Sequence, residues 1–310
     1  MSLIVTGTIG IDTVHTPDGT ERKDVLGGSC TYFAAAASFY TGVRMVAAVG
    51  DDLPDEHRKT LAAFPRIDTA GLETRAGSKT FRWGGKYMDD MDHRETLFTE
   101  LGVLEEAPPP VPEAFKDSEY VFLANSHPAV QMGMLEALPS RKLVVADTMD
   151  LWINIAKDEL IALLAKVDGL VLNFDEAELF TGIKNTVAAG RKLLEYGPRF
   201  VVVKKGEHGA ILIHQDGIAA LPAYPTERVV DPTGAGDSFA GGMMGHIARE
   251  GETGHQADPG AFRTIRQALA HGTVIASFNI ESFSLDRLKK LQTNEIDDRY
   301  EEYVRMVRVD

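Results

Sequence analysis

The sequence of 310 residues contains a single cysteine, Cys30, and this scarcity excludes several kinds of protein. One cysteine cannot form an intrachain disulfide or supply the thiolates of a cysteine-based zinc site. The sequence also lacks an uninterrupted apolar run of about 18 residues, so we expect no transmembrane helix. The first twelve residues, MSLIVTGTIGID, lack the basic segment of a secretory signal. These absences predict a cytoplasmic protein that does not bind a membrane.

Basic residues are in the minority: the chain has 32 Lys and Arg and 46 Asp and Glu, which gives a net charge of −14. An acidic balance of this size argues against a nucleic acid or an anionic membrane as partner, although a local basic pocket can still hold a phosphate. Hydrophobic residues make up 44% of the chain, enough for a sizeable core. We therefore expect a globular protein with a small-molecule partner.

Short apolar runs rich in β-branched residues recur along the chain, at 3–7, 44–50, 120–125, 142–147, 169–173 and 200–206. Each run is continuous rather than alternating, which is typical of parallel strands covered on both faces. Helical patterns lie between and after them, at 31–40, 56–64, 129–137, 153–166, 187–196, 235–249, 262–277 and 285–307. The alternation predicts an α/β fold in three layers, with a doubly wound, mostly parallel sheet in a single domain over 1–310.

Ligands of such sheets bind at the carboxyl ends of the strands. The candidates at these ends are Gly7, Gly50, Asn125, Asp147, Asn173 and Gly206. Residues 79–101, KTFRWGGKYMDDMDHRETLFTEL, instead alternate like exposed strands around a Gly-Gly turn. This segment predicts a small β lid inserted into the main domain.

The stretch 231–242, DPTGAGDSFAGG, is predicted to be a turn that leads into a helix. The N–H groups of Gly234, Ala235 and Gly236 would lack intrahelical partners and would form an anion hole at the positive end of the helix dipole. No lysine follows the last glycine, so the stretch is not a P-loop. Asp237, in the first helical turn, is either a helix cap or a general base that takes a proton from a substrate hydroxyl.

This motif resembles the second signature of the ribokinase-like (PfkB) carbohydrate kinase family, Asp-Thr-x-Gly-Ala-Gly-Asp, with Pro232 in place of the usual Thr. Four other stretches agree in order with elements of that family: GTIGIDTV (7–14), GGSCTYFAAAA (27–37), NFDE (173–176) and KKGEHGA (204–210). The resemblance implies an ATP- and Mg²⁺-dependent kinase that transfers the γ-phosphoryl group to a hydroxyl of a small sugar or polyol.

For the acceptor, the resemblance implies a site made by Asp12, at the end of the first strand region, with Gly27 and Gly28. Tyr32 stands where the family usually has Asn, and it would stack on a ring or fill space. A turn-stabilising role is the structural alternative for Asp12.

For ATP, the resemblance implies contacts from Asn173, Gly206, Gly209 and Lys204, which replaces the usual Thr, and an adenine contact from His271. Lys204 and Lys205 would point to opposite faces of their strand, so one of them faces the site. Glu176 would hold Mg²⁺ through water, and Asp231 would belong to a K⁺ site with the segment 276–284. A plain helix start with acidic residues is the alternative for 173–176.

Several alternatives stay open at this stage. The acceptor could be a nucleoside or inositol, or the chain could be a nucleotide-sensing protein that lost catalysis. A dehydrogenase would need Gly-x-Gly-x-x-Gly after the first strand, which GTIGID does not supply. The sequence leaves both a monomer and a homodimer possible.

Overall fold

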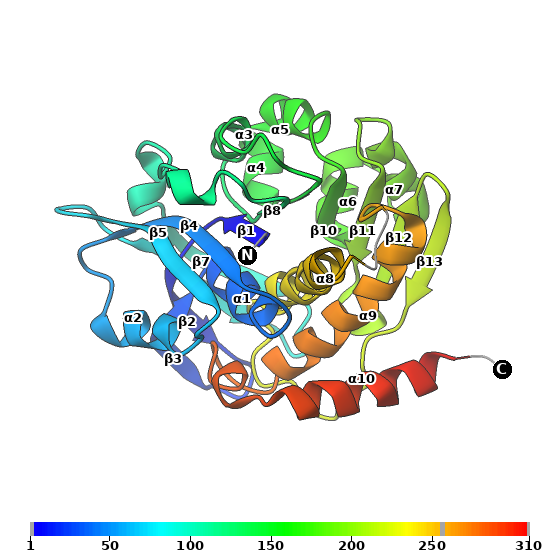
Figure 1. Ribbon diagram of the computed structural model, residues 1–310. Helices are drawn as coiled ribbons and strands as arrows, with labels where there is room; N and C mark the ends of the chain where they lie inside the picture. Colours follow the sequence, from blue (N-terminus) through cyan, green and yellow to red (C-terminus); the bar gives the residue numbers. More distant parts are fainter. Residues whose placement is uncertain (1–2, 255–257, 309–310) are drawn as a thin grey trace.

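The computed structural model describes residues 3–254 and 258–308, which form a nine-stranded sheet flanked by helices (Figure 1). The strand order is β13-β12-β11-β10-β9-β8-β1-β4-β5. All neighbours are parallel except at β12 and β13, which add antiparallel at one edge. The strands are β1 (Leu3–Thr6), β4 (Val43–Gly50), β5 (Ile67–Arg75), β8 (Tyr120–Leu123), β9 (Leu143–Asp147), β10 (Gly169–Asn173), β11 (Phe200–Lys204), β12 (Ala210–His214) and β13 (Gly217–Leu221).

The six predicted strands are confirmed as β1, β4, β8, β9, β10 and β11. The strands β5, β12 and β13 were not predicted. They lie at the sheet edges, where β5 and β13 are only partly covered and do not form continuous apolar runs.

The sheet separates two hydrophobic cores, because successive residues of each strand point to opposite faces. In β1, Leu3 and Val5 enter one core and Ile4 the other. The first core also contains residues of α1 (Ser29–Ala37), α2 (Asp55–Ala62), α8 (Ala235–Glu252), α9 (Phe262–Asn279) and α10 (Thr293–Val307). The second contains residues of α3 (Pro128–Glu136), α4 (Asp150–Ile155), α5 (Lys157–Leu164), α6 (Phe174–Thr181) and α7 (Thr186–Leu194). The predicted three-layer fold is therefore confirmed.

Three helix predictions need correction. The helix expected over 153–166 is two helices, α4 and α5, because Ala156 leaves the helical conformation with φ −138° and ψ 38°. The helix expected from residue 285 begins at Thr293, where Glu295 accepts a hydrogen bond from the N–H of Gln292. No range was predicted for α6, although a helix start was one of the two interpretations of 173–176.

A second sheet of four strands, in the order β3-β2-β6-β7, forms the lid. The strands β6 (Phe81–Tyr87) and β7 (Arg94–Glu100) lie in the predicted segment, but β2 (Gly10–His15) and β3 (Glu21–Gly27) were not assigned to the lid. The predicted Gly-Gly turn is wrong, because Gly84 and Gly85 lie inside β6 under the rings of Phe98 and Trp83. The chain reverses at 88–93 instead. Within the described ranges, no helix combines the length and apolarity needed to cross a membrane.

Candidate active site

The glycine-rich turn meets the first turn of α8, as predicted. Gly234 is the N-cap with φ 75°, and a side chain there would overlap the ring of Tyr32. The N–H of Ala235 donates to the carbonyl of Pro232 at 3.1 Å and is thus already used within the turn. At Gly236, a Cβ would lie 2.7 Å from Nζ of Lys204. The ammonium of Lys204 therefore lies against Gly236 in the first turn of α8, at the positive end of the helix dipole, where an anion can bind.

Asp237 lies one residue beyond this place, in the first turn of α8. Burial raises the pKa of its carboxyl to about 7, and the charge of Asp147 adds to the shift while Lys204 opposes it. A carboxyl with a pKa near neutrality can accept a proton and return it at physiological pH. The position and the pKa of Asp237 both suit a general base.

Lys204, at the end of β11, is the lysine that faces the site. Its Nζ lies 3.9 Å from Oδ2 of Asp147, at the end of β9. Lys205 points away, over the ring of Phe174 and toward the hydroxyl of Thr186 at 3.4 Å. Asp147 was expected only as one of several polar strand ends, and no motif indicated that it would pair with Lys204.

Asn173 and Glu176 form a reciprocal cap at the start of α6. Oδ1 of Asn173 accepts from the N–H of Glu176, and Oε2 of Glu176 accepts from the N–H of Asn173, both at 2.8 Å. The helix-start alternative is therefore present. Burial, followed by the charge of Asp147, raises the pKa of Glu176 to about 7. Buried carboxylates that repel each other here fit a divalent cation, and Mg²⁺ requires few protein ligands.

Asp12 lies on β2 of the lid, which corrects its expected place at the end of a main-sheet strand. It is 4% exposed, and its Oδ1 has no hydrogen-bond partner within the described part of the chain. Burial, then the charges of Asp231 and Asp237, raises the pKa of Asp12 to about 8. A buried carboxyl with an unused oxygen fits a ligand that brings hydroxyl groups.

Gly27 and Gly28 adjoin Asp12, as predicted. A side chain on Gly27 would overlap the carboxylate of Asp12, and one on Gly28, which has φ 95°, would overlap the carbonyl of Thr8. These two glycines therefore leave Asp12 the room that it occupies beside the N-terminus of α1.

Tyr32 fills space in the core, which is the second of the two expectations, and does not stack on a substrate ring. Its ring is 1% exposed and packs beneath Gly234, so it offers no face for a substrate ring to stack on. Its hydroxyl has no hydrogen-bond partner among the described residues. Burial, with Asp231 and Asp12 nearby, raises the pKa of this hydroxyl, which stays protonated and can donate a hydrogen bond.

Asp231 is fully buried at the start of the turn. Its Oδ1 accepts from the N–H of Thr233 at 2.9 Å, whereas its Oδ2 has no partner in the described ranges. Asn279, at the end of α9, donates to the carbonyl of Thr233 at 2.9 Å, and its Oδ1 is likewise buried without a partner. Asp231 and Asn279 thus both bind Thr233, and each has one buried oxygen without a partner among the described residues, which fits a cation. Asn279 lies within 276–284, the segment expected to share a K⁺ site with Asp231.

His271 does not face the candidate site. Its ring is stacked between those of His246 on α8 and Tyr300 on α10, with centroids 3.8 and 4.1 Å away. Both faces are covered, so the expected adenine contact is wrong in this arrangement. Gly209, with φ 86°, packs against the carbonyl of Leu221, and this contact explains its lack of a side chain. Gly206 lies against the carboxylate of Asp92 in the lid.

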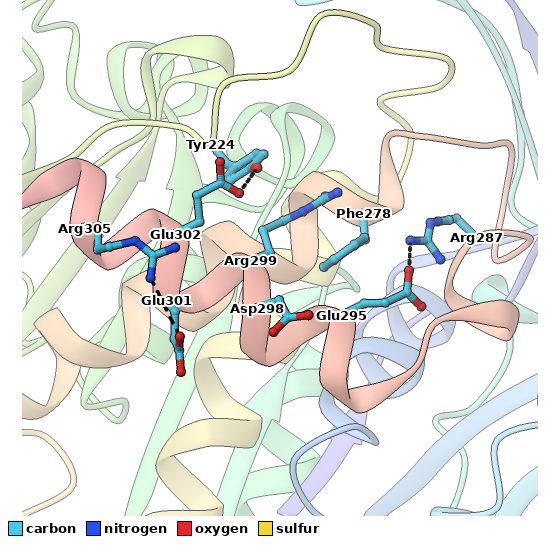
Figure 2. A pocket seen from close by; sticks show the side chains of 9 residues that line it. All are labelled: Tyr224, Phe278, Arg287, Glu295, Asp298, Arg299, Glu301, Glu302 and Arg305. Carbon is cyan, nitrogen blue, oxygen red and sulfur yellow. Dashed lines mark hydrogen bonds and ion pairs between the residues drawn. The ribbon is translucent and has the colours of Figure 1, made fainter.

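A separate cavity of about 510 Å³ lies along α10 and beside α9 (Figure 2). Its cations are paired with carboxylates: Arg287 with Glu295 at 2.6 Å, Arg299 with Glu281 at 2.7 Å, and Arg305 with Glu301 at 3.7 Å. It contains none of the predicted site residues, so we do not assign the active site to it.

Comparisons with known proteins show the family of the chain. The sequence model of one family, described as pfkB family carbohydrate kinase, matches residues 11–290. A cytidine kinase of Thermococcus kodakarensis is 29% identical over 256 residues, which are 80% of this chain and 89% of the relative.

Two solved structures share the fold. The nucleoside kinase of Burkholderia thailandensis in complex with ADP-inosine has a TM-score of 0.76 at 18% identity, over 97% of this chain and 95% of that one. The ribokinase of Giardia lamblia has a TM-score of 0.79 at 18% identity, over 97% and 99%. Nucleoside and sugar kinases thus share this architecture, and the fold does not decide the acceptor.

Proposed function

Because the chain belongs to the pfkB family of carbohydrate kinases and is a phosphotransferase, we propose that it transfers the γ-phosphoryl group of ATP to a hydroxyl of a nucleoside. The choice of a nucleoside over a free sugar is supported by the cytidine kinase, whose match covers four-fifths of the chain. Asp12 and Gly28 suit a ribose, whether it belongs to a nucleoside or is the free sugar.

The observation that carries the mechanism is that the ammonium of Lys204 lies against Gly236, the residue that precedes Asp237 in α8. In this proposal Asp237 takes the proton of the acceptor hydroxyl. The amide of Gly236 and the ammonium of Lys204 stabilise the negative charge on the transferred group. Mg²⁺, which kinases of this family use with ATP, would be held near Glu176 and would neutralise phosphate charge.

On the acceptor side, the unused oxygen of Asp12 accepts hydrogen bonds from ribose hydroxyls. Because Asp12 belongs to the lid, the bound acceptor also joins the lid to the core. The lid then excludes water, which would otherwise compete with the acceptor for the phosphoryl group.

A monovalent cation such as K⁺ would be held by Asp231 and Asn279, whose buried oxygens have no other partners in the described ranges. A cation there would fix the turn at Thr233, which both residues bind. The first turn of α8, with Gly236 and Asp237, follows directly in the chain.

The test is an acceptor screen with Mg-ATP, in which ADP formation is measured with cytidine, other nucleosides, ribose and inositol. Asp237→Asn protein, purified in parallel, controls for contaminating kinases. We expect turnover with at least one nucleoside. Turnover with ribose or inositol and with no nucleoside would contradict the proposed acceptor and leave the kinase assignment intact. Thermal shifts with a non-hydrolysable ATP analogue give a second readout that does not need turnover.

A further inference from the structure

The turn of the lid hairpin, residues 88–93, is anchored to the core on both sides. Before it, the hydroxyl of Tyr87 lies 3.0 Å from that of Thr233, in the turn before α8. Within it, Asp92 packs its carboxylate against Gly206 and accepts a hydrogen bond from the N–H of Glu207. The hairpin therefore lies across both core loops that flank Lys204 and Asp237.

Arg94 follows this turn as the first residue of β7, opposite Tyr87 in the strand register. Its guanidinium lies over the ring of Trp83, 5.5 Å from the centroid, and part of the residue stays open to solvent. Among the described residues, Arg94 has no carboxylate within ion-pair distance. Arg82, in the same sheet, differs, because it pairs with Asp24 at 3.0 Å and with Asp52 at 3.8 Å.

The strand register places Arg94 near Asp12, because Asp12 pairs with Trp83, whose ring lies under the guanidinium of Arg94. Its positive charge lowers the pKa of Asp12 on the acceptor side, of Asp237 at the anion hole and of Glu176 on the ATP side. Desolvation lowers the pKa of Arg94, but Tyr87, Glu176 and Asp150 together outweigh it, so the pKa is raised. A cation that influences the acceptor, the base and the magnesium carboxylate lies close to the path between ATP and acceptor.

We propose that Arg94 binds the phosphoryl group during its transfer, a role that rests on the kinase function proposed above. In this step the bond from the γ-phosphorus to the β–γ bridging oxygen breaks, and a bond to the acceptor oxygen forms. The acceptor proton passes to Asp237, and ADP leaves. Arg94 forms no covalent bond. Its planar fork of N–H donors matches two oxygens of the moving group, which Lys204 contacts from the core side.

The lid thus contributes to catalysis in addition to excluding water. Closure brings a cation that has no ion-pair partner in the described chain to a place where negative charge accumulates. The arginine finger of GTPases, which is also delivered to the transferred phosphoryl group, raises kcat by about 10³- to 10⁵-fold. We expect a smaller effect here, about 100-fold, because Lys204 and Mg²⁺ share the charge.

The experiment compares Arg94→Met and Arg94→Lys with the matched lid control Arg82→Met. The measurements are kcat, KM for ATP, KM for the acceptor identified in the screen, and thermal melting. We expect Arg94→Met to lower kcat about 100-fold with both KM values within about threefold, Arg94→Lys to recover part of the rate, and Arg82→Met to stay near the parent.

An unchanged kcat in Arg94→Met would overturn the proposal, as would a loss confined to KM for the acceptor. If Arg94→Met does not fold, Arg94→Lys still decides, because a kcat equal to the parent's contradicts a need for the planar fork. The slow ATP hydrolysis without acceptor is measured on the same proteins. This hydrolysis requires no acceptor. If only the acceptor class is wrong, Arg94→Met still slows ATP hydrolysis, whereas an unchanged rate of hydrolysis shows that the role of Arg94 is wrong.

Discussion

The ammonium of Lys204 lies 3.9 Å from the carboxylate of Asp147, across the strand β10 that separates their own strands. This pair governs the charge of the active site. Asp147 raises the pKa of Asp237 and Glu176, and Lys204 lowers both. Changes at Lys204 therefore affect the binding of phosphate and the proton affinity of the base together.

Lys204→Met is expected to raise KM for ATP about 10- to 100-fold, the factor for one hydrogen bond to a charged group worth about 1.5–3 kcal/mol. Lys205→Met is the matched control, because that side chain points toward Phe174 and Thr186. Steady-state kinetics with varied ATP measure both. Equal effects of the two substitutions would show that the strand does not orient Lys204 as described.

Asp237→Asn is expected to lower turnover by about 100-fold or more while ATP still binds, because the amide cannot take the proton of the acceptor. Calorimetry with a non-hydrolysable ATP analogue measures binding, and ADP formation measures turnover. Near-normal turnover would remove Asp237 from the role of base.

The pH dependence of kcat/KM follows from the raised pKa of Asp237. The base must be ionised, and its pKa is about 7, so kcat/KM should rise with pH and level off above that value. Because Lys204 lowers this pKa, Lys204→Met should move the rising limb to higher pH. A flat profile between about pH 5 and pH 8 would contradict the assignment.

Asp12→Asn is expected to weaken acceptor binding and to stabilise the fold at alkaline pH. Burial raises the pKa of Asp12 from 3.8 to about 8, so the folded state holds this proton more tightly than the unfolded chain. The stability that this group contributes is present below about pH 4 and is lost as the pH rises toward about 8.

Asparagine cannot ionise, so the variant should melt above the parent at about pH 8 and not at about pH 4. The difference corresponds to about 2 °C for each kcal/mol in a chain of this size. Melting curves at the two pH values test the sign of the difference in melting temperature between Asp12→Asn and the parent. An equal difference at both pH values would refute the ionisation of Asp12 as its cause.

K⁺ is expected to raise turnover relative to choline at equal ionic strength, because Asp231 and Asn279 present unused buried oxygens. Asn279→Ala should reduce this response. The comparison of both salts on both proteins separates a cation site from a general salt effect, which would be the same in the variant.

The parallel core of the fold could be predicted because its strands are continuous apolar runs, whereas β5 and β13 lie at the edges and lack that pattern. Asp12 could be selected from sequence, but its place in the lid could not, because β2 pairs with β6, about seventy residues later in the chain. A single sequence carries no local sign of such a pairing.

The site residues also differ in how far they could be predicted, because some depend on contacts between segments that are distant in the sequence. Lys204 and Gly236 could be predicted because each lies in a recognisable motif, and the structure brings them together. Arg94 lies in a charged segment that resembles an ordinary solvated turn, and its importance comes from where the hairpin ends. His271 stands where the family places an adenine contact, yet His246 and Tyr300 cover its ring, and neither partner could be identified from the motif.

Asp12, the proposed acceptor residue, lies on the same small sheet as Arg94 and as Tyr87, whose hydroxyl is 3.0 Å from that of Thr233. The effect of bound nucleotide on acceptor affinity and the effect of bound acceptor on nucleotide affinity are therefore set by one coupling free energy. If bound nucleotide strengthens acceptor binding by some factor, bound acceptor must strengthen nucleotide binding by the same factor. A substitution that stiffens the small sheet far from both ligands would change the two affinities together, and its effect could be measured from either side.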